Sequence, residues 1–259
     1  MAFLRARTSS MLMLGAVAFF LAGALFQVRQ SRAAEPTLKL TWYGQSAFRL
    51  DTPGGTVAIM DPVPDALGYS MPKAKADLVT VSHEHFDHIA VDKATGGPKV
   101  LRGLKPGGGW HAIDETVADI RVTSVGTFHD DKQGKERGLN SVFVLETAGM
   151  RVAHLGDLGH LLTDDQLKAI GPVDVVLVPV GGHFTIDASE ALAVVEQLKP
   201  RRIVIPMHFK TSRMTMKVPI ATVAPFLAKA GKVRKVKEDY LTLSPGGRGR
   251  EVVLLGAGW

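Results

Sequence analysis

The chain has 259 residues, with 31 Lys and Arg, 25 Asp and Glu, 9 His and no Cys. The lack of cysteine excludes disulfide bonds, thiolate metal ligands and cysteine nucleophiles. Much of the formal net charge of +6 comes from the first 34 residues, which hold four arginines and no acidic residue. The other 27 basic and 25 acidic residues leave a net charge of +2, which gives no case for nucleic-acid binding.

The first 34 residues have the organisation of a secretory signal peptide. Arg5 and Arg7 form a basic start, residues 11–26 are an apolar core, and small residues offer a cleavage site after residue 33 or 34. The core is short for a membrane span, which needs about 20 residues, although an uncleaved N-terminal anchor is the alternative. We therefore expect a periplasmic or secreted protein with no stable membrane association after cleavage.

Residues 35–259 have the pattern of a single domain of short strands interspersed with helices. The strands we expect end at Gly, Pro, Asp or His and lie at 38–50, 56–60, 78–81, 99–101, 120–128, 141–146, 151–155, 173–180 and 202–206. Helices are expected at 164–170, 188–199 and 220–230. The second helix has the clearest signals, with Asp187 as N-cap, Glu190 three residues later and Pro200 at its end. This mixture favours an α/β fold of two packed sheets covered by helices.

The densest chemical signal follows the predicted strand at 78–81. Residues 83–88 are His-Glu-His-Phe-Asp-His, three imidazoles and a carboxylate in H-x-H-x-D-H spacing. Neutral imidazole and carboxylate are ligands that Zn²⁺ and related divalent ions favour. The alternative is a solvated polar loop. We expect a metal-binding loop at the end of a strand.

Further candidate ligands recur where other predicted strands end. His129 ends one strand, His154 and Asp157 close a second, and His208 terminates a third. Ligands on loops that rigid strands position are the expected construction of a catalytic site. The pattern therefore predicts that these strand ends meet.

At these residues the chain resembles the metallo-β-lactamase-fold hydrolase superfamily, and within it the metal-dependent hydrolases related to the ascorbate-6-phosphate lactonases. The motifs that carry the resemblance are 42–48 (WYGQSAF), 60–62 (MDP), 83–88 (HEHFDH), 127–130 (TFHD), 154–157 (HLGD), 180–185 (VGGHFT) and 206–208 (PMH). The resemblance implies the four-layer αβ/βα sandwich of the metallo-β-lactamase type over essentially all of residues 38–259.

The resemblance also implies two adjacent divalent ions, expected to be Zn, with Mn, Fe and Ni as alternatives. The implied ligands are His83, His85 and His129 for the first ion, Asp87, His88 and His208 for the second, and Asp157 as the bridge. Asp61 would be a carboxylate that orients a ligand imidazole. Gln45 departs from the pattern, because relatives often carry histidine there.

These assignments predict an exported hydrolase that uses a metal-bridging hydroxide to cleave an ester, lactone or phosphodiester of a small-molecule substrate. Asp157 or Asp87 would accept the proton, and His183 is a candidate general acid or substrate contact. Two other functions stay open. One is an iron-dependent oxidoreductase of the thiol or persulfide oxygenase type on the same fold, and the other is a non-catalytic metal-binding protein.

Several polar residues near the motifs have weaker signals. We expect His154 to be a packed, hydrogen-bonded histidine, whereas for His160 a contact at the rim of the site and a place away from it both stay open. The charged segment 130–138 is either a mobile loop that covers the site or an ordinary solvated hairpin connection. Asn140, just beyond it, is a candidate for orienting a loop or contacting substrate.

Overall fold

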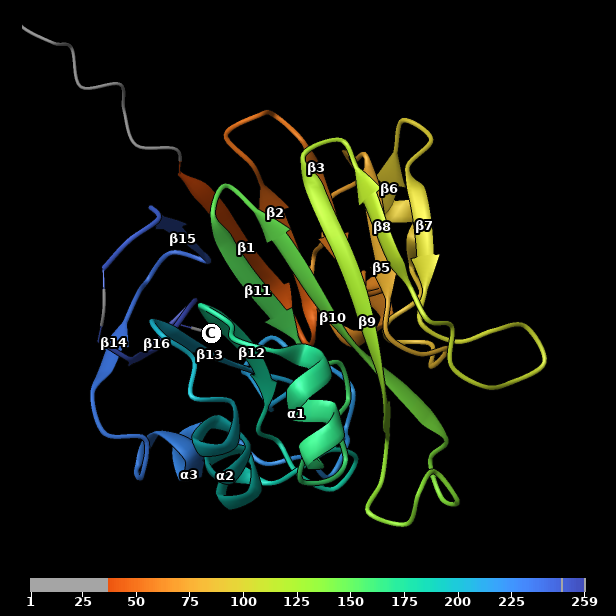
Figure 1. Cartoon of the computed structure of the whole chain (residues 1–259). Helices are drawn as coiled ribbons and strands as arrows, with labels where there is room; N and C mark the ends of the chain where they lie inside the picture. Colours follow the sequence, from red (N-terminus) through yellow and green to blue (C-terminus); the bar gives the residue numbers. More distant parts are fainter. Residues whose placement is uncertain (1–36, 248, 259) are drawn as a thin grey trace, which may run out of the picture. The chain divides into compact units, whose positions relative to one another are not determined.

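Two β-sheets carry the structure, a computed structural model that describes residues 37–247 and 249–258 (Figure 1). The first sheet has six strands, in the order β15 (Tyr240–Leu243), β1 (Leu38–Gly44), β2 (Ala47–Asp51), β3 (Val57–Met60), β5 (Leu78–Val81) and β7 (Lys99–Arg102). The predicted leader lies outside the described residues, which belong to the compact unit Glu35–Trp259. Within those residues, no helix is long and apolar enough to cross a membrane.

The second sheet has eight strands. Their order is β14 (Val233–Lys235), β16 (Glu251–Leu254), β13 (Ile203–Met207), β12 (Val175–Pro179), β11 (Met150–His154), β10 (Leu139–Thr147), β9 (Ile120–Phe128) and β8 (Asp114–Val117). The strands from β8 to β11 are antiparallel, whereas β11, β12, β13 and β16 run parallel. Every residue of β12 and β13 is buried, as expected of parallel strands covered on both faces.

The predicted strand at 38–50 is two strands, because the chain reverses between β1 and β2. Gly44 pairs with Ala47 across a tight turn, and Gly44 has a φ of 99°. A Cβ at this position would lie 2.2 Å from the ring of Tyr69, so the backbone approach and the left-handed conformation both require glycine. Gln45, the next residue, also has a positive φ, at 48°.

Three helices gather against the second sheet (Figure 1), where α1 (Asp164–Ile170) contacts β9 and α2 (Ala188–Leu198) contacts β12. The predicted capping box of α2 is confirmed, since Asp187 accepts backbone N–H bonds and Glu190 bonds back to the Asp187 N–H. The predicted helix at 220–230 is wrong in extent, because α3 covers only Ala224–Leu227. Pro225 is tolerated only in the first turn of a helix, so no helix can run through it from residue 220.

The main core fills the space between the sheets and continues to the helices that cover the second sheet, and a second core covers the outer face of the first sheet. Alternate residues of β3 separate the two, since Ala58 and Met60 belong to the main core and Ile59 to the second. The outer core also holds Leu67 and Tyr69, from a segment with the 3-10 helix Asp65–Leu67 (η1). The predicted sandwich is confirmed. Near the first sheet, however, the chain forms no long helices among the described residues. It forms loops, the 3-10 turns η1 and η2 (Val91–Lys93), and the strand pair β4 (Ala74–Lys75) and β6 (Ala94–Thr95).

Candidate metal centre

The ends of several strands meet at one edge of the sandwich. His83 follows β5, His129 follows β9, His208 follows β13, and Asp157 lies three residues after β11. Because β9 and β11 are both antiparallel to β10, and β13 runs parallel to β11 through β12, their carboxyl ends lie at the same edge. The seven residues that the resemblance implies as ligands are brought together there.

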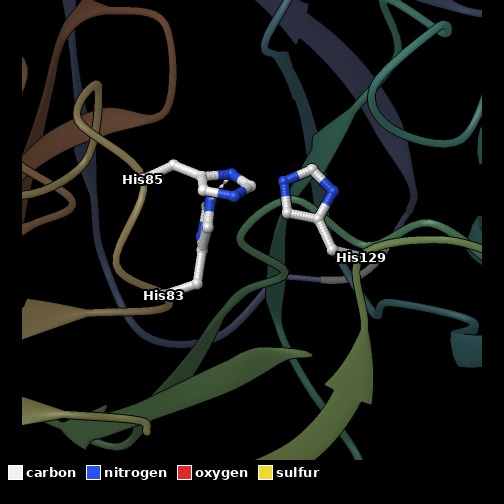
Figure 2. A group of neighbouring side chains, drawn as sticks. All are labelled: His83, His85 and His129. Atoms are coloured by element: carbon white, nitrogen blue, oxygen red, sulfur yellow. Dashed lines mark hydrogen bonds between the residues drawn. The ribbon is translucent and has the colours of Figure 1, made fainter. Parts of the chain in front are cut away.

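Three histidines form the first group of side chains. His83, His85 and His129 each offer one ring nitrogen, and these atoms lie within 4.8 Å of one another. Figure 2 shows the three rings converging from two separate loops, with centroids between 4.6 and 4.8 Å apart. His83 and His129 are buried, whereas His85 is exposed and opens the group toward solvent.

Two carboxylates and two histidines form the second group, made up of Asp87, His88, Asp157 and His208, whose ligand atoms also lie within 4.8 Å of one another. Asp157 stands between the groups. Its Oδ2 lies 3.3 Å from His129 Nε2 and 3.1 Å from His208 Nε2, and its Oδ1 lies 3.3 Å from His88 Nε2. One carboxylate therefore faces nitrogen atoms of both groups.

Several ring nitrogens of this cluster are buried and have no hydrogen-bond partner among the residues that the structure describes. They are His88 Nε2, both nitrogens of His129, and His208 Nδ1. Buried polar atoms without partners are costly. An imidazole lone pair that faces a carboxylate oxygen is also repelled by it unless a cation or a proton lies between them. The buried donor set of imidazole and carboxylate therefore fits divalent metal ions.

Asp61 contacts His88 and Ser82 and so orients side chains of the cluster. Its Oδ2 lies 2.8 Å from His88 Nδ1 and accepts the Ser82 hydroxyl at 2.5 Å, and its Oδ1 accepts the Ser82 backbone N–H at 2.7 Å. Ser82 Oγ is in turn 2.9 Å from His83 Nδ1. In a neutral ring, these contacts favour the proton on Nδ1 of His88 and of His83 and leave Nε2 as a lone pair toward the site. Asp61 lies where the resemblance implies, whereas Ser82 was not predicted because no sequence signal distinguishes it.

Asn140 fixes the backbone of Asp157. Its Oδ1 accepts the Asp157 N–H at 3.0 Å, and its Nδ2 donates to Thr127 Oγ1 at 2.8 Å and to Leu155 O at 2.9 Å. Gly156 has a φ of 55°, and a Cβ there would lie 2.3 Å from Asn140 Oδ1. The prediction that Asn140 orients a loop is confirmed.

The charges of the cluster shift one another's pKa. Burial raises the pKa of Asp157, but His208 and His88 outweigh it and hold that pKa well below its ordinary value. Burial, with His88 close by, keeps the pKa of His83 well below 6.5. Burial also opposes the charged form of His88, yet Asp157, Asp87 and Asp61 together raise the His88 pKa. Asp157 is therefore an anion and His83 a neutral imidazole, the forms in which both bind metals.

Residues 39–208 match the family described as the β-lactamase superfamily domain. A crystal structure from Thermotoga maritima, a Zn-dependent hydrolase of the metallo-β-lactamase superfamily by its description, is 34% identical, with a TM-score of 0.67 over 84% of this chain and 99% of that one. The chain belongs to the metallo-β-lactamase superfamily.

Two relatives agree with this assignment, and the first of them is named for its activity. A UPF0173 metal-dependent hydrolase from Anaeromyxobacter sp. (strain K) is 35% identical over 220 residues, 70% of this chain and 78% of the relative. A UPF0173 protein from Pyrococcus abyssi is 31% identical over 186 residues, 67% of this chain and 84% of the relative. This member of the superfamily is a metal-dependent hydrolase, and the predicted metallo-β-lactamase-type fold is confirmed.

In this superfamily member a cavity of about 370 Å³ opens above the cluster. His85, Asp87, His129, Asp157 and His208 line one part of it. Apolar side chains line another part, namely Leu67, Phe86, Phe184, Met216, Val218 and Ile220. The size suits a small-molecule substrate, since ligand pockets commonly measure roughly 300–1,000 Å³.

His183 does not join the cluster. The residue is exposed and has a φ of 59°, and its ring packs edge-on against Phe184 at 4.5 Å between centroids. Phe184 lines the cavity, whereas His183 is not among the cavity-lining residues of the described chain. Among the described residues, the ring contact that His183 makes is to Phe184, and its catalytic role stays a prediction.

Two other histidines are structural. Buried His154 donates from Nε2 to Ser46 O at 2.7 Å and accepts the Gly156 N–H on Nδ1 at 3.1 Å, which is the packed arrangement expected of it. His160 accepts the Phe128 N–H on Nε2 at 3.0 Å and donates from Nδ1 to its neighbouring carbonyl at 2.7 Å. Both rings are therefore engaged in holding the backbone.

The charged segment 130–138 connects β9 to β10 and is organised around one carboxylate. Asp130 accepts four backbone N–H bonds of 2.7 to 3.0 Å from Lys132, Gly134, Glu136 and Arg137. Asp130 itself is 3% exposed. Of the two interpretations of this segment, the geometry supports a hairpin connection with a fixed conformation, which borders the cavity through Glu136 and Arg137.

Proposed function

We propose that the protein is a two-metal hydrolase that cleaves an ester, a lactone or a phosphodiester in a small molecule. The observation that carries the proposal is the place of Asp157, whose two oxygens face His129 and His208 on one side and His88 on the other at 3.1 to 3.3 Å. A carboxylate in this position supports two adjacent ions that share a ligand. Zn is the metal we favour, because imidazole and carboxylate suit it.

The chain's own residues would hold and orient this site. His83, His85 and His129 would bind one ion, Asp87, His88 and His208 the other, and Asp157 both. Bound ions of this kind lower the pKa of a water to roughly 7 and polarise the oxygen of the bond that is cleaved. Asp61 and Ser82 keep the imidazole lone pairs directed at the site.

Proton transfer is assigned to Asp87. Gln45 Nε2 donates to Asp87 Oδ2 at 3.0 Å, which fixes the carboxylate at the cavity. Asp87 is half-buried and lines the cavity, whereas Asp157 is 2% exposed and surrounded by imidazoles. Asp87 is therefore better placed to exchange a proton with solvent.

We further propose that the enzyme is exported and acts in the periplasm. The basic start, the apolar core and the small residues at 31–34 support this proposal. Fractionation of cells that express the full chain, followed by N-terminal sequencing, tests it. Recovery of the protein from the periplasm with a new N-terminus near residue 34 or 35 is expected, and an intact N-terminus in the cytoplasm would contradict it.

The hydrolase proposal is tested by metal analysis with matched kinetics. The purified chain is stripped with a chelator, reloaded with Zn, Mn, Fe or Ni, and screened against activated esters, lactones and phosphodiesters. We expect two ions per chain and metal-dependent turnover, with Asp157→Asn losing both and the exposed Asp92→Asn retaining both. One ion per chain, or oxygen consumption with iron and a thiol substrate, would favour the oxidoreductase instead.

A further inference from the structure

Arg137 is the one lysine or arginine among the cavity-lining residues of the described chain. Its position is set by the backbone, because the Arg137 N–H donates to Asp130 Oδ2 at 2.7 Å. The Asp130 carboxylate accepts three further N–H bonds of the same connection. A cationic side chain is thus presented to the cavity from a preorganised loop.

The neighbouring acidic side chain engages Arg137 only weakly. Arg137 Nη1 lies 3.4 Å from Glu136 Oε2, a long contact, while Glu136 Oε1 is bonded closely by Lys132. The guanidinium has five N–H donors in a planar fork, and the Arg137 side chain keeps 30% of its surface exposed. Donors therefore remain for an anion that enters the cavity.

An aromatic ring supports the same guanidinium. The Arg137 guanidinium carbon lies 5.9 Å from the centroid of the Phe184 ring, within the range of a cation–π contact. Phe184 itself lines the cavity. Stacking on this ring limits the orientations of the fork, which lowers the entropy lost when an anion binds.

An apolar wall completes the cavity. Met216, Val218 and Ile220 all line the cavity, and they alternate with the exposed Lys217 and Pro219. The segment is tied to η1 by the Thr215 N–H, which donates to Leu67 O at 3.0 Å. Phe86, which also lines the cavity, is 53% exposed. Apolar surface held open to water in a cavity is stabilised by an apolar ligand.

We propose, on the basis of the hydrolase function above, that the substrate carries an anionic group as well as an apolar segment, and that Arg137 binds the anion while the wall binds the apolar segment. Arg137 is thereby a specificity-determining residue. A neutral substrate of equal length would use the same metal-binding residues and forfeit the contact to Arg137.

Matched esters test this assignment in the metal-loaded enzyme. Mono-4-nitrophenyl adipate and 4-nitrophenyl hexanoate have the same chain length and differ by a terminal carboxylate. We expect Arg137→Gln to raise KM for the adipate ester by roughly tenfold or more, since a charged hydrogen-bonded contact is lost, and to leave kcat/KM for the hexanoate ester within about twofold. The corresponding ester of 5-phosphonopentanoic acid shows whether a phosphonate binds better than a carboxylate.

Three variants make the comparison specific. Arg137→Lys keeps the charge without the fork and should lie between the wild type and Arg137→Gln. Phe184→Leu removes the aromatic support and should weaken adipate binding by a smaller factor. Arg121→Gln removes the same charge from an exposed pair with Asp114 outside the cavity, so it should change neither ester. Equal effects of Arg137→Gln on both esters, or no effect on either, would overturn the proposal.

Calorimetry with adipic acid monoanilide and hexanoic anilide separates this proposal from the hydrolase function. If the metal-loaded chain hydrolyses no ester, lactone or phosphodiester, the hydrolase proposal fails, yet selective loss of monoanilide binding in Arg137→Gln still supports anion recognition. Equal binding of both anilides by the wild type and by Arg137→Gln would refute anion recognition even in an active hydrolase.

Discussion

Asn140 Oδ1 accepts the backbone N–H of Asp157 at 3.0 Å, and this bond couples the hairpin that precedes the site to the carboxylate at its centre. Asn140 lies in β10, pairs with Thr127 of β9, and also donates to Leu155 O just after β11. One fully buried amide thus joins the ends of three neighbouring strands. Its removal should loosen the site without deleting a proposed ligand.

We expect Asn140→Ala to lower the free energy of unfolding of the metal-free protein by about 2–4 kcal/mol, because buried backbone groups lose their partners. Zinc affinity should fall by roughly 10- to 100-fold, as for other groups that orient ligands. Urea unfolding and competition with a chromogenic chelator measure the two effects. Unchanged zinc affinity in a destabilised protein would show that Asn140 has only a structural role.

Asp61→Ala should weaken zinc binding by roughly 10- to 100-fold, because His88 and Ser82 lose the carboxylate that orients them. Asp61→Asn should weaken zinc binding by a smaller factor, because the amide oxygen can still accept a hydrogen bond from Ser82. His88 should still be oriented less well, since a neutral amide is a weaker acceptor than a carboxylate. The same chelator competition, with the exposed Asp92→Asn as control, measures both. Wild-type affinity in both Asp61 variants would contradict the orienting role.

Asp130→Ala should make the connection between β9 and β10 more mobile. Four backbone N–H groups lose their acceptor, so amide hydrogen exchange of residues 132–137 should accelerate by roughly tenfold or more. Exchange in α2 should stay unchanged and serves as the internal control. Slow exchange throughout 132–137 in the variant would show that other contacts hold this loop.

The same carboxylate predicts a dependence on pH. Burial raises the pKa of Asp130, but the N–H bonds from Arg137, Gly134, Lys132 and Glu136 outweigh it and lower that pKa. A carboxyl whose pKa is lower in the folded state stabilises the fold above its unfolded pKa of about 4 and loses this contribution as the pH falls. We therefore expect amide hydrogen exchange of residues 132–137, after correction for the intrinsic exchange rate at each pH, to accelerate below about pH 4 in the wild type. The same measurement on Asp130→Ala should show no such acceleration.

Gly44→Ala should be strongly destabilising, because the new Cβ would meet the Tyr69 ring in addition to a φ of 99°. Gly55→Ala provides a matched control, with a φ of 86° and no atom within 4 Å of the methyl group that the substitution adds. We expect a loss of about 1 kcal/mol at Gly55 and roughly 1–3 kcal/mol more at Gly44. Equal melting temperatures of the two variants would show that Tyr69 moves aside at no cost.

Local signals explain which elements were predictable. The ranges of α1, β5 and β9 agree with expectation because caps, Gly-Pro and apolar runs mark their ends. Edge strand β8 was missed because its half-exposed Asp-Glu-Thr-Val sequence looks like a polar loop. The extent of α3 was overestimated because residues 220–223 contain no helix breaker, whereas the backbone of Ala221 pairs with Lys210 and Gly181 and not within a helix.

The metal-binding residues of the candidate site could be predicted because clusters of histidine and aspartate are rare in sequences. Residues of common types, which support the site, could not be recognised in this way. Histidine and aspartate at strand ends indicated the cluster, and the structure brings those seven side chains together. Asn140 was indicated only by its place next to the charged segment 130–138, and Ser82 was missed because serine is common in loops and strands. Arg137 and the apolar wall meet only through tertiary folding, since about 80 residues separate them along the chain.

The segment that carries Met216, Val218 and Ile220 leaves the sheet after His208 and is anchored again where the Ala221 N–H donates to Gly181 O at 2.8 Å. None of the seven clustered side chains belongs to this excursion. Substitutions or length changes between the anchors can therefore retune which molecules are accepted while the reaction centre keeps its geometry, so selectivity and reactivity can evolve, or be engineered, independently.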